Sequence, residues 1–143
     1  MKKIIIITIT LFALASCTNK EEKAKESFRQ GMKHLEKSQF DAALTKINEA
    51  IEYADDNQRY YFYRGNIYLN KEKYTKAIQE YDQALKIDST YADAWLNKGN
   101  AVFYKTGSKN QACPFWLKAQ KHGENNLINK IKGCPGFTID MVR

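Results

Sequence analysis

The chain has 143 residues, of which 43% are hydrophobic and only two are proline. This length suits one domain with a hydrophobic core, and the scarcity of proline permits long helices. The formal net charge is +7, yet no run of Lys or Arg lines one predicted helix face, so the composition does not indicate a nucleic-acid-binding protein. The charge indicates a solvated helical surface, with attraction to anionic surfaces or acidic partners as the alternative.

Residues 1–17 have the pattern of an export signal. Lys2 and Lys3 precede an apolar stretch at residues 4–15. This stretch is too short to cross a bilayer, which takes about 20 helical residues, but it suits a secretory signal. It leads into the sequence LASC at residues 14–17, which resembles the bacterial lipobox. Cleavage before Cys17 would remove two lysines and lower the net charge from +7 to +5.

The lipobox resemblance implies that Cys17 is diacylated and becomes the N-terminal residue of the mature protein. These acyl chains are the only cofactor-like group that we expect, and more than one chain gives stable membrane anchoring. The alternative is an ordinary signal peptide, residues 1–16, followed by an incidental cysteine.

Residues 17–23 are predicted to be the lipidated cysteine and a polar tether. Thr18 stands where an Asp would resemble an inner-membrane retention signal, so we expect a lipid-anchored protein of the bacterial outer membrane. Lys20, Glu21 and Glu22 resemble a short tag for export to the cell surface. The periplasmic face and the cell surface both remain open.

Residues 60–85 hold two amphipathic helix patterns joined by a short polar turn. Small residues recur around this stretch at an interval of 34, at Gly31, Gly65 and Gly99 and again at Ala43 and Ala77. Aromatic residues fill other positions of the pattern, namely Tyr61, Tyr74, Tyr81 and Trp95. These spacings resemble the tetratricopeptide repeat (TPR), a helix-turn-helix unit of 34 residues.

The resemblance implies an all-α fold, a TPR-type helix-turn-helix solenoid of about three repeats with a C-terminal capping helix. One repeat cannot bury its apolar face alone, so repeats stack. The glycines would let the two helices of a repeat approach closely, and the alanines would lie where they cross. The predicted repeats cover residues 24–57, 58–91 and 92–124, and the capping helix and tail cover residues 125–143.

The third repeat departs from the pattern. Its small residue Ala112 comes one position late, which indicates a one-residue insertion between the helices. Pro114 is predicted to kink or delay the second helix, and Gly123 to end it. A short terminal helix over residues 125–132 is expected to turn three apolar side chains inward, those of Leu127, Ile128 and Ile131.

Cys113 and Cys134 are predicted to form a structural disulfide that holds the terminal helix against the third repeat. They form an even pair in an oxidising compartment once Cys17 is lipidated. A catalytic redox pair and a zinc site are the alternatives. The absence of a CxxC motif argues against the first, and a structural zinc site takes about four ligands, whereas only His122 adds to the pair.

The resemblance also implies a partner-binding groove lined by the first helix of each repeat. Its candidate residues are Arg59, Phe62, Tyr63, Asn66, Asn97, Asn100 and Tyr104. Asn66 and Asn97 match asparagines that bind the peptide in carboxylate-clamp members of the family. Phe62 replaces the clamp lysine, so we expect the groove to hold an extended peptide or a partner helix rather than a clamped C-terminus. The alternative is that these side chains are only solvated or face the first repeat.

No motif for catalysis or metal binding stands out, because the two histidines are isolated and there is no glycine-rich phosphate loop. We therefore expect no enzyme and no metal. Two function classes remain, a membrane-anchored adaptor that binds a protein or peptide and a structural subunit docked permanently in a larger envelope assembly.

Overall fold

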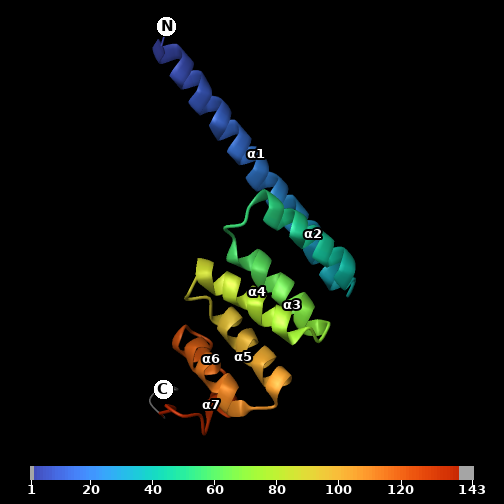
Figure 1. Cartoon of the computed structure of the whole chain (residues 1–143), viewed down its shortest axis with the longest axis vertical. Helices are drawn as coiled ribbons and strands as arrows, with labels where there is room; N and C mark the ends of the chain where they lie inside the picture. Colours follow the sequence, from blue (N-terminus) through green and yellow to red (C-terminus); the bar gives the residue numbers. More distant parts are fainter. Residues whose placement is uncertain (1, 139–143) are drawn as a thin grey trace. The chain divides into compact units, whose positions relative to one another are not determined.

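The computed structural model describes the backbone of residues 2–138 and the side chains of residues 19–138. That part of the chain is all-helical and contains no strand (Figure 1). Its helices are α1 (Lys2–Glu36), α2 (Phe40–Tyr53), α3 (Gln58–Asn70), α4 (Tyr74–Ile87), α5 (Ala92–Thr106), α6 (Lys109–Lys121) and α7 (Ile128–Ile131). The chain divides into two compact units, residues 1–56 and residues 57–143.

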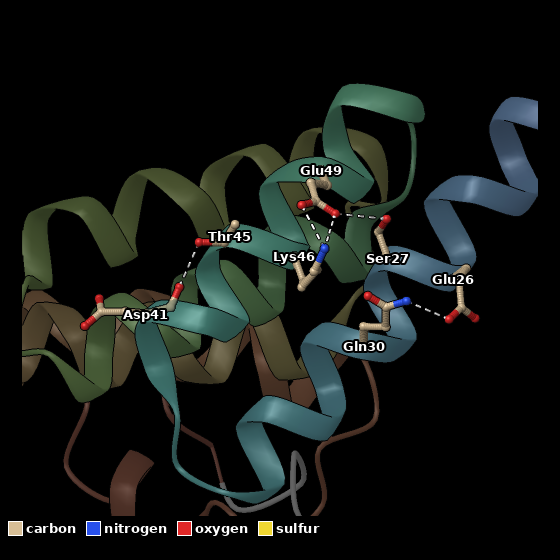
Figure 2. A network of polar contacts seen from close by, with 7 residues as sticks. All are labelled: Glu26, Ser27, Gln30, Asp41, Thr45, Lys46 and Glu49. Atoms are coloured by element: carbon tan, nitrogen blue, oxygen red, sulfur yellow. Dashed lines mark hydrogen bonds and ion pairs between the residues drawn. The ribbon is translucent and has the colours of Figure 1, made fainter.

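The first unit is the helix pair α1 and α2. Gly31 lies where the helices approach, because a Cβ atom there would be 2.9 Å from Cγ1 of Ile47. The buried Ser27 of α1 donates a hydrogen bond to Oε2 of Glu49 on α2 at 3.4 Å, and Lys46 donates to both oxygens of the same carboxylate (Figure 2). The two helices are thus joined by an apolar contact and a polar one.

Helix α1 includes the residues of the predicted polar tether. It continues without a break through residues 18–23, which we expected to separate the lipid from the first repeat. Charge pairs with helical spacing support the helix here and one turn later, since Lys25 contacts Glu21 at 2.8 Å and Arg29 contacts Glu26 at 2.7 Å. Among the residues with described side chains, no helix is both long enough and apolar enough to cross a membrane.

The second unit contains two helix-turn-helix repeats, α3 with α4 and α5 with α6, and the short helix α7. Helix α4 packs against both α3 and α5 (Figure 1). Its fully buried Ala77 and Tyr81 belong to a core with Phe62 of α3 and Ala101 of α5. Asn57 caps α3 by accepting a hydrogen bond from the backbone of Arg59 at 3.0 Å.

Each repeat turns at a residue with left-handed backbone conformation. Ser38 and Glu72, 34 positions apart, both have φ of 56°, and Gly107, 35 positions after Glu72, has φ of 67°. At the first two turns a Schellman pair of hydrogen bonds ends the preceding helix, as in the 2.8 Å bond from Lys73 N to Tyr68 O. The recurrence at 34 and then 35 marks one extra residue in the third repeat.

The same offset appears where the helices cross. Gly65 faces Tyr81 sixteen residues later, whereas Gly99 faces Trp116 seventeen residues later. Helix α5 has 15 residues against 13 in α3, whereas the turn after it has two residues against three, so the one extra residue lies in the helix rather than in the turn.

The C-terminal part differs from the sequence prediction in two details. Pro114 does not delay α6, which begins at Lys109 with Ser108 as its cap and includes the proline. Gly123, with φ of 107°, ends the helix as predicted. Helix α7 covers only Ile128–Ile131, and Ile128 is 40% exposed rather than inward-facing. Buried Leu127 and Ile131 hold this segment against Trp116 and its neighbours.

Candidate binding groove

A row of three asparagines crosses from α3 to α5. The Oδ1 atom of Asn66 accepts one hydrogen bond from the Tyr81 hydroxyl at 2.8 Å and another from Nδ2 of Asn97 at 2.9 Å. Asn97 in turn accepts from Nδ2 of Asn100, one helical turn further along α5, at 3.4 Å. All three side chains are partly exposed. The structure therefore brings together Asn66, Asn97 and Asn100, which the sequence placed in one groove.

One end of this asparagine row carries a cation that the sequence did not indicate. Oδ1 of Asn100 accepts from Nε1 of Trp116 and from Nζ of Lys130, both at 3.2 Å. The Lys130 ammonium also lies 5.2 Å from the centre of the Trp116 ring. Lys130 belongs to α7, so its approach depends on how the terminal segment folds back on α5 and α6.

Phe62 is a correction to the predicted groove. Its side chain is only 8% exposed and packs against the rings of Tyr91 at 5.0 Å, Tyr63 at 5.3 Å and Tyr81 at 6.0 Å. Phe62 belongs to α3, and these contacts place its ring against α4 and the start of α5. Phe62 is therefore a core residue, whereas Arg59 is exposed and Tyr63 is half-buried beside it.

Tyr104 lies near the end of α5, apart from the bonded row. It is 59% exposed and its ring is 6.0 Å from that of Tyr74. The two tyrosines line an open hollow of about 350 Å³ together with Leu69, Asn70 and Glu72. This hollow lies one helical turn beyond Asn100 and combines two aromatic rings with the polar side chains of Asn70 and Glu72.

Burial perturbs two phenols near the row. Burial raises the pKa of Tyr81, whose hydroxyl is the donor to Asn66. Burial, followed by the nearby charge of Asp93, raises the pKa of Tyr91 to about 12. Both phenols are therefore neutral at physiological pH, and Tyr81 keeps the proton that fixes the Asn66 amide.

Cys113 on α6 and Cys134, three residues after α7, are bonded as a disulfide, with their Cα atoms 5.6 Å apart. Both cysteines are buried in the cluster that contains Trp116, Leu127 and Ile131. The bridge thus fixes the segment that carries Lys130. The side chain of Cys17, the predicted lipidation site, lies outside the described residues, and the described ones include no group of three His, Cys, Asp or Glu that could hold a metal.

A second aromatic cluster shares no residue with the asparagine row. The rings of Trp95 on α5 and Phe115 on α6 are stacked at 6.3 Å. The Lys118 ammonium lies 4.2 Å from the Trp95 ring, and that of Lys98 lies 4.5 Å from the Phe115 ring. Lys98 also pairs with Asp82 of α4. We call these residues of α4, α5 and α6 the Trp95 cluster.

Comparison with known proteins supports the resemblance to the tetratricopeptide repeat. Residues 65–107 match the family model of the TPR repeat. A small glutamine-rich tetratricopeptide repeat-containing protein of Saccharomyces cerevisiae is 27% identical over 110 residues, which are 77% of this chain and 32% of that protein. The chain therefore spans about a third of the length of this relative.

Solved TPR domains have the same fold. The TPR domain of Arabidopsis OM64 is similar with a TM-score of 0.73 and 22% identity, covering 80% of this chain and 95% of that one. The first TPR domain of Spaghetti (RPAP3), solved with the HSP90 peptide SRMEEVD, has a TM-score of 0.73 and 18% identity, covering 79% and 90%. The TPR2B domain of yeast Sti1, solved in a complex named for pHsp70, has a TM-score of 0.70 and 20% identity, covering 78% and 92%. The chain thus has the all-helical fold of TPR domains and contains a recognisable TPR repeat.

Proposed function

We propose that this protein is a lipid-anchored adaptor of the bacterial cell envelope, which binds an extended segment of a partner protein along α3 and α5. The asparagine row carries this proposal. Its three partly exposed amides are held in fixed positions by Tyr81, Trp116 and each other, as suits groups that bond a peptide backbone. The similarity to TPR domains solved with peptides supports a peptide or protein as the partner.

Photo-crosslinking in living cells tests this function. A photoreactive phenylalanine analogue at the exposed Tyr104 should capture a partner, because this position lies one helical turn beyond Asn100 and borders the hollow beside Tyr74. The same analogue at Phe115, in the Trp95 cluster, is the matched control. Capture from Tyr104 that is lost in an Asn66→Ala, Asn97→Ala double variant supports the groove, and capture from Phe115 alone contradicts it.

The second candidate function, a permanently docked structural subunit, is favoured by the Trp95 cluster. Two stacked aromatic rings flanked by Lys98 and Lys118 present apolar surface and charge together, a combination suited to a protein interface. Crosslinks from Phe115 into one fixed-stoichiometry complex, with none from Tyr104, would select this function over the adaptor.

The membrane anchor is tested separately. The proposal of acylation at Cys17 rests on the LASC sequence after an apolar stretch. The Cys17→Ala variant should leave the membrane fraction or accumulate as the uncleaved precursor, whereas Ser16→Ala, which keeps the cysteine, should fractionate like the unchanged chain. Normal cleavage and membrane association of Cys17→Ala would contradict the anchor.

A further inference from the structure

The hydrogen bonds of the asparagine row use most of its amide acceptors, all but one lone pair on Oδ1 of Asn97, and leave more donors than acceptors. An amide oxygen has two lone pairs, and Oδ1 of Asn66 already accepts from Tyr81 and Asn97. Oδ1 of Asn100 likewise accepts from Trp116 and Lys130. Both oxygens are therefore saturated before any partner arrives.

The N–H groups of the row are in surplus. Each amide nitrogen has two N–H groups, and Asn97 and Asn100 each use one within the row. Within residues 19–138, Nδ2 of Asn66 meets no acceptor. Lys130 has three N–H groups and donates one of them to Asn100. The row thus offers donors along its length and a positive charge at one end, which suits a partner rich in oxygen acceptors with one carboxylate.

The position of that charge depends on the disulfide. Helix α7 has four residues, too few to be stable on its own. It is held by the buried side chains of Leu127 and Ile131, by the bridge from Cys134 to Cys113, and by a 2.8 Å hydrogen bond from Nζ of Lys109 to the carbonyl of Lys132. Lys130 itself is exposed, and its ammonium reaches Asn100 and the face of Trp116 only while the backbone of α7 stays in this position.

We propose that Lys130 is the specificity-determining residue of the groove, that it selects partner segments bearing a carboxylate, and that the Cys113–Cys134 disulfide positions it for this role. The inference rests on the proposed groove function and adds the chemistry of the partner. This selection differs from selection by a lysine on the first helix of a repeat, because here the cation comes from the terminal segment that the disulfide holds. Reduction of the bridge would therefore lower the preference for carboxylates while the asparagines stay in place.

Three peptide pools test the proposal on the full chain in detergent micelles. Each pool contains acetylated hexapeptides with four uncharged randomised positions. The first ends in two glutamates and an amide, the second in two glutamines and a free carboxylate, and the third in two glutamines and an amide. Peptides retained with the protein on filtration are quantified by mass spectrometry. A preference for the first pool identifies a side-chain carboxylate as the preferred group, and a preference for the second pool identifies a terminal carboxylate.

The oxidised protein should retain one carboxylate pool about three- to tenfold more than the neutral pool, the range expected for a partly exposed charge-assisted hydrogen bond. Lys130→Gln should remove this preference and keep retention of the neutral pool, and Lys130→Arg should restore it. Lys132→Gln removes the same charge two residues away and should behave like the unchanged protein. Dithiothreitol should act like Lys130→Gln, with circular dichroism recorded to show that the helices remain.

Five outcomes would count against the proposal. The preference could survive in Lys130→Gln, fall equally in Lys132→Gln, or persist after complete reduction of the disulfide. Equal retention of all three pools would overturn the carboxylate selection alone and leave the groove function standing. Retention of no pool by the unchanged protein would instead overturn the groove function on which the inference rests. The lysine variants keep the bridge intact, so they decide the role of the charge whatever reduction does to the fold.

Discussion

Gly99 and Gly107 are both on or next to α5, but the structure requires a glycine at each for a different reason. A Cβ atom on Gly99 would lie 2.5 Å from both Cδ1 and Nε1 of Trp116. A Cβ atom on Gly107 would meet nothing within 4 Å, but its φ of 67° is a conformation that L-residues disfavour. Steric contact is therefore decisive at the first position and backbone conformation at the second.

Gly99→Ala should lower the free energy of unfolding. Overpacking costs about 1–3 kcal/mol, and the 2.5 Å approach to the buried Trp116 places Gly99→Ala in the upper part of this range, above the gain of about 1 kcal/mol from replacing glycine by alanine within a helix. Gly107→Ala should cost about 1 kcal/mol through the backbone alone. Urea denaturation followed by circular dichroism measures both changes.

A replacement by asparagine separates the two causes. Asparagine tolerates the left-handed region, so Gly107→Asn should recover part of the stability lost in Gly107→Ala. Gly99→Asn adds a still larger side chain next to Trp116 and should recover none. An increase in stability for Gly99→Ala would show that the aromatic ring can move aside freely.

Helices α3–α6 could be predicted from the sequence because their apolar residues repeat with helical spacing at an interval of 34. The close approach at Gly65 and Gly99 was likewise predictable, since only a small residue fits where two helices cross. The burial of Phe62 was not, because it depends on the ring of Tyr91, which lies in the turn that leads into α5. Position within a repeat does not reveal how far the following turn covers it.

The contact between Lys130 and Asn100 could not be predicted either. The two residues are 30 positions apart, and their contact follows from the folding of a terminal segment that no helical period describes. The cysteine pair was the one sequence feature that bore on this contact, since it predicted that the segment after Gly123 returns to α6. Ile128 was misplaced because α7 is four residues long, too short to have a regular buried face.

Tyr81 and Tyr91 make the packing between α4 and its neighbours sensitive to alkaline pH. Burial raises the pKa of both phenols, and that of Tyr91 reaches about 12, whereas an unfolded chain has a tyrosine pKa of about 10. The native state thus favours the neutral phenol. The stability that these residues contribute is fully present below pH of about 10 and is lost as the pH rises through about 12.

The free energy of unfolding should therefore fall between pH 10 and 12, and less steeply in Tyr91→Phe than in the unchanged chain. Denaturant titrations at several pH values in this range give the slope. Tyr104→Phe removes a phenol that is 59% exposed and is the control for loss of a hydroxyl as such. Identical slopes in Tyr91→Phe and Tyr104→Phe would contradict the assignment of the alkaline transition to buried phenols.

On the scale of the chain, residues 57–143 form one unit, in which α7 is the last described helix and the disulfide ties it to α6. A helical repeat leaves an apolar face for the next repeat to cover. Here the side chains of Leu127 and Ile131 cover the apolar face of α6 that another full repeat would otherwise cover. Since the covering segment is short, the covalent bridge contributes much of what keeps it in place.

Reduction should loosen this segment before the rest of the unit. The bridge joins residues 21 positions apart, and a closed loop of similar size is worth about 3 kcal/mol in the chain-entropy account. Hydrogen exchange measured by mass spectrometry, with and without dithiothreitol, should show faster exchange after Gly123 first, then in α6 around Cys113. Peptides from α3 and α4 should remain protected longest, because their contacts at Gly65, Ala77 and Tyr81 do not involve the bridge. Equal deprotection of α3 and the terminal segment would mean that the unit unfolds as one cooperative block, and unchanged exchange after Gly123 would mean that Leu127 and Ile131 hold the segment without the bridge.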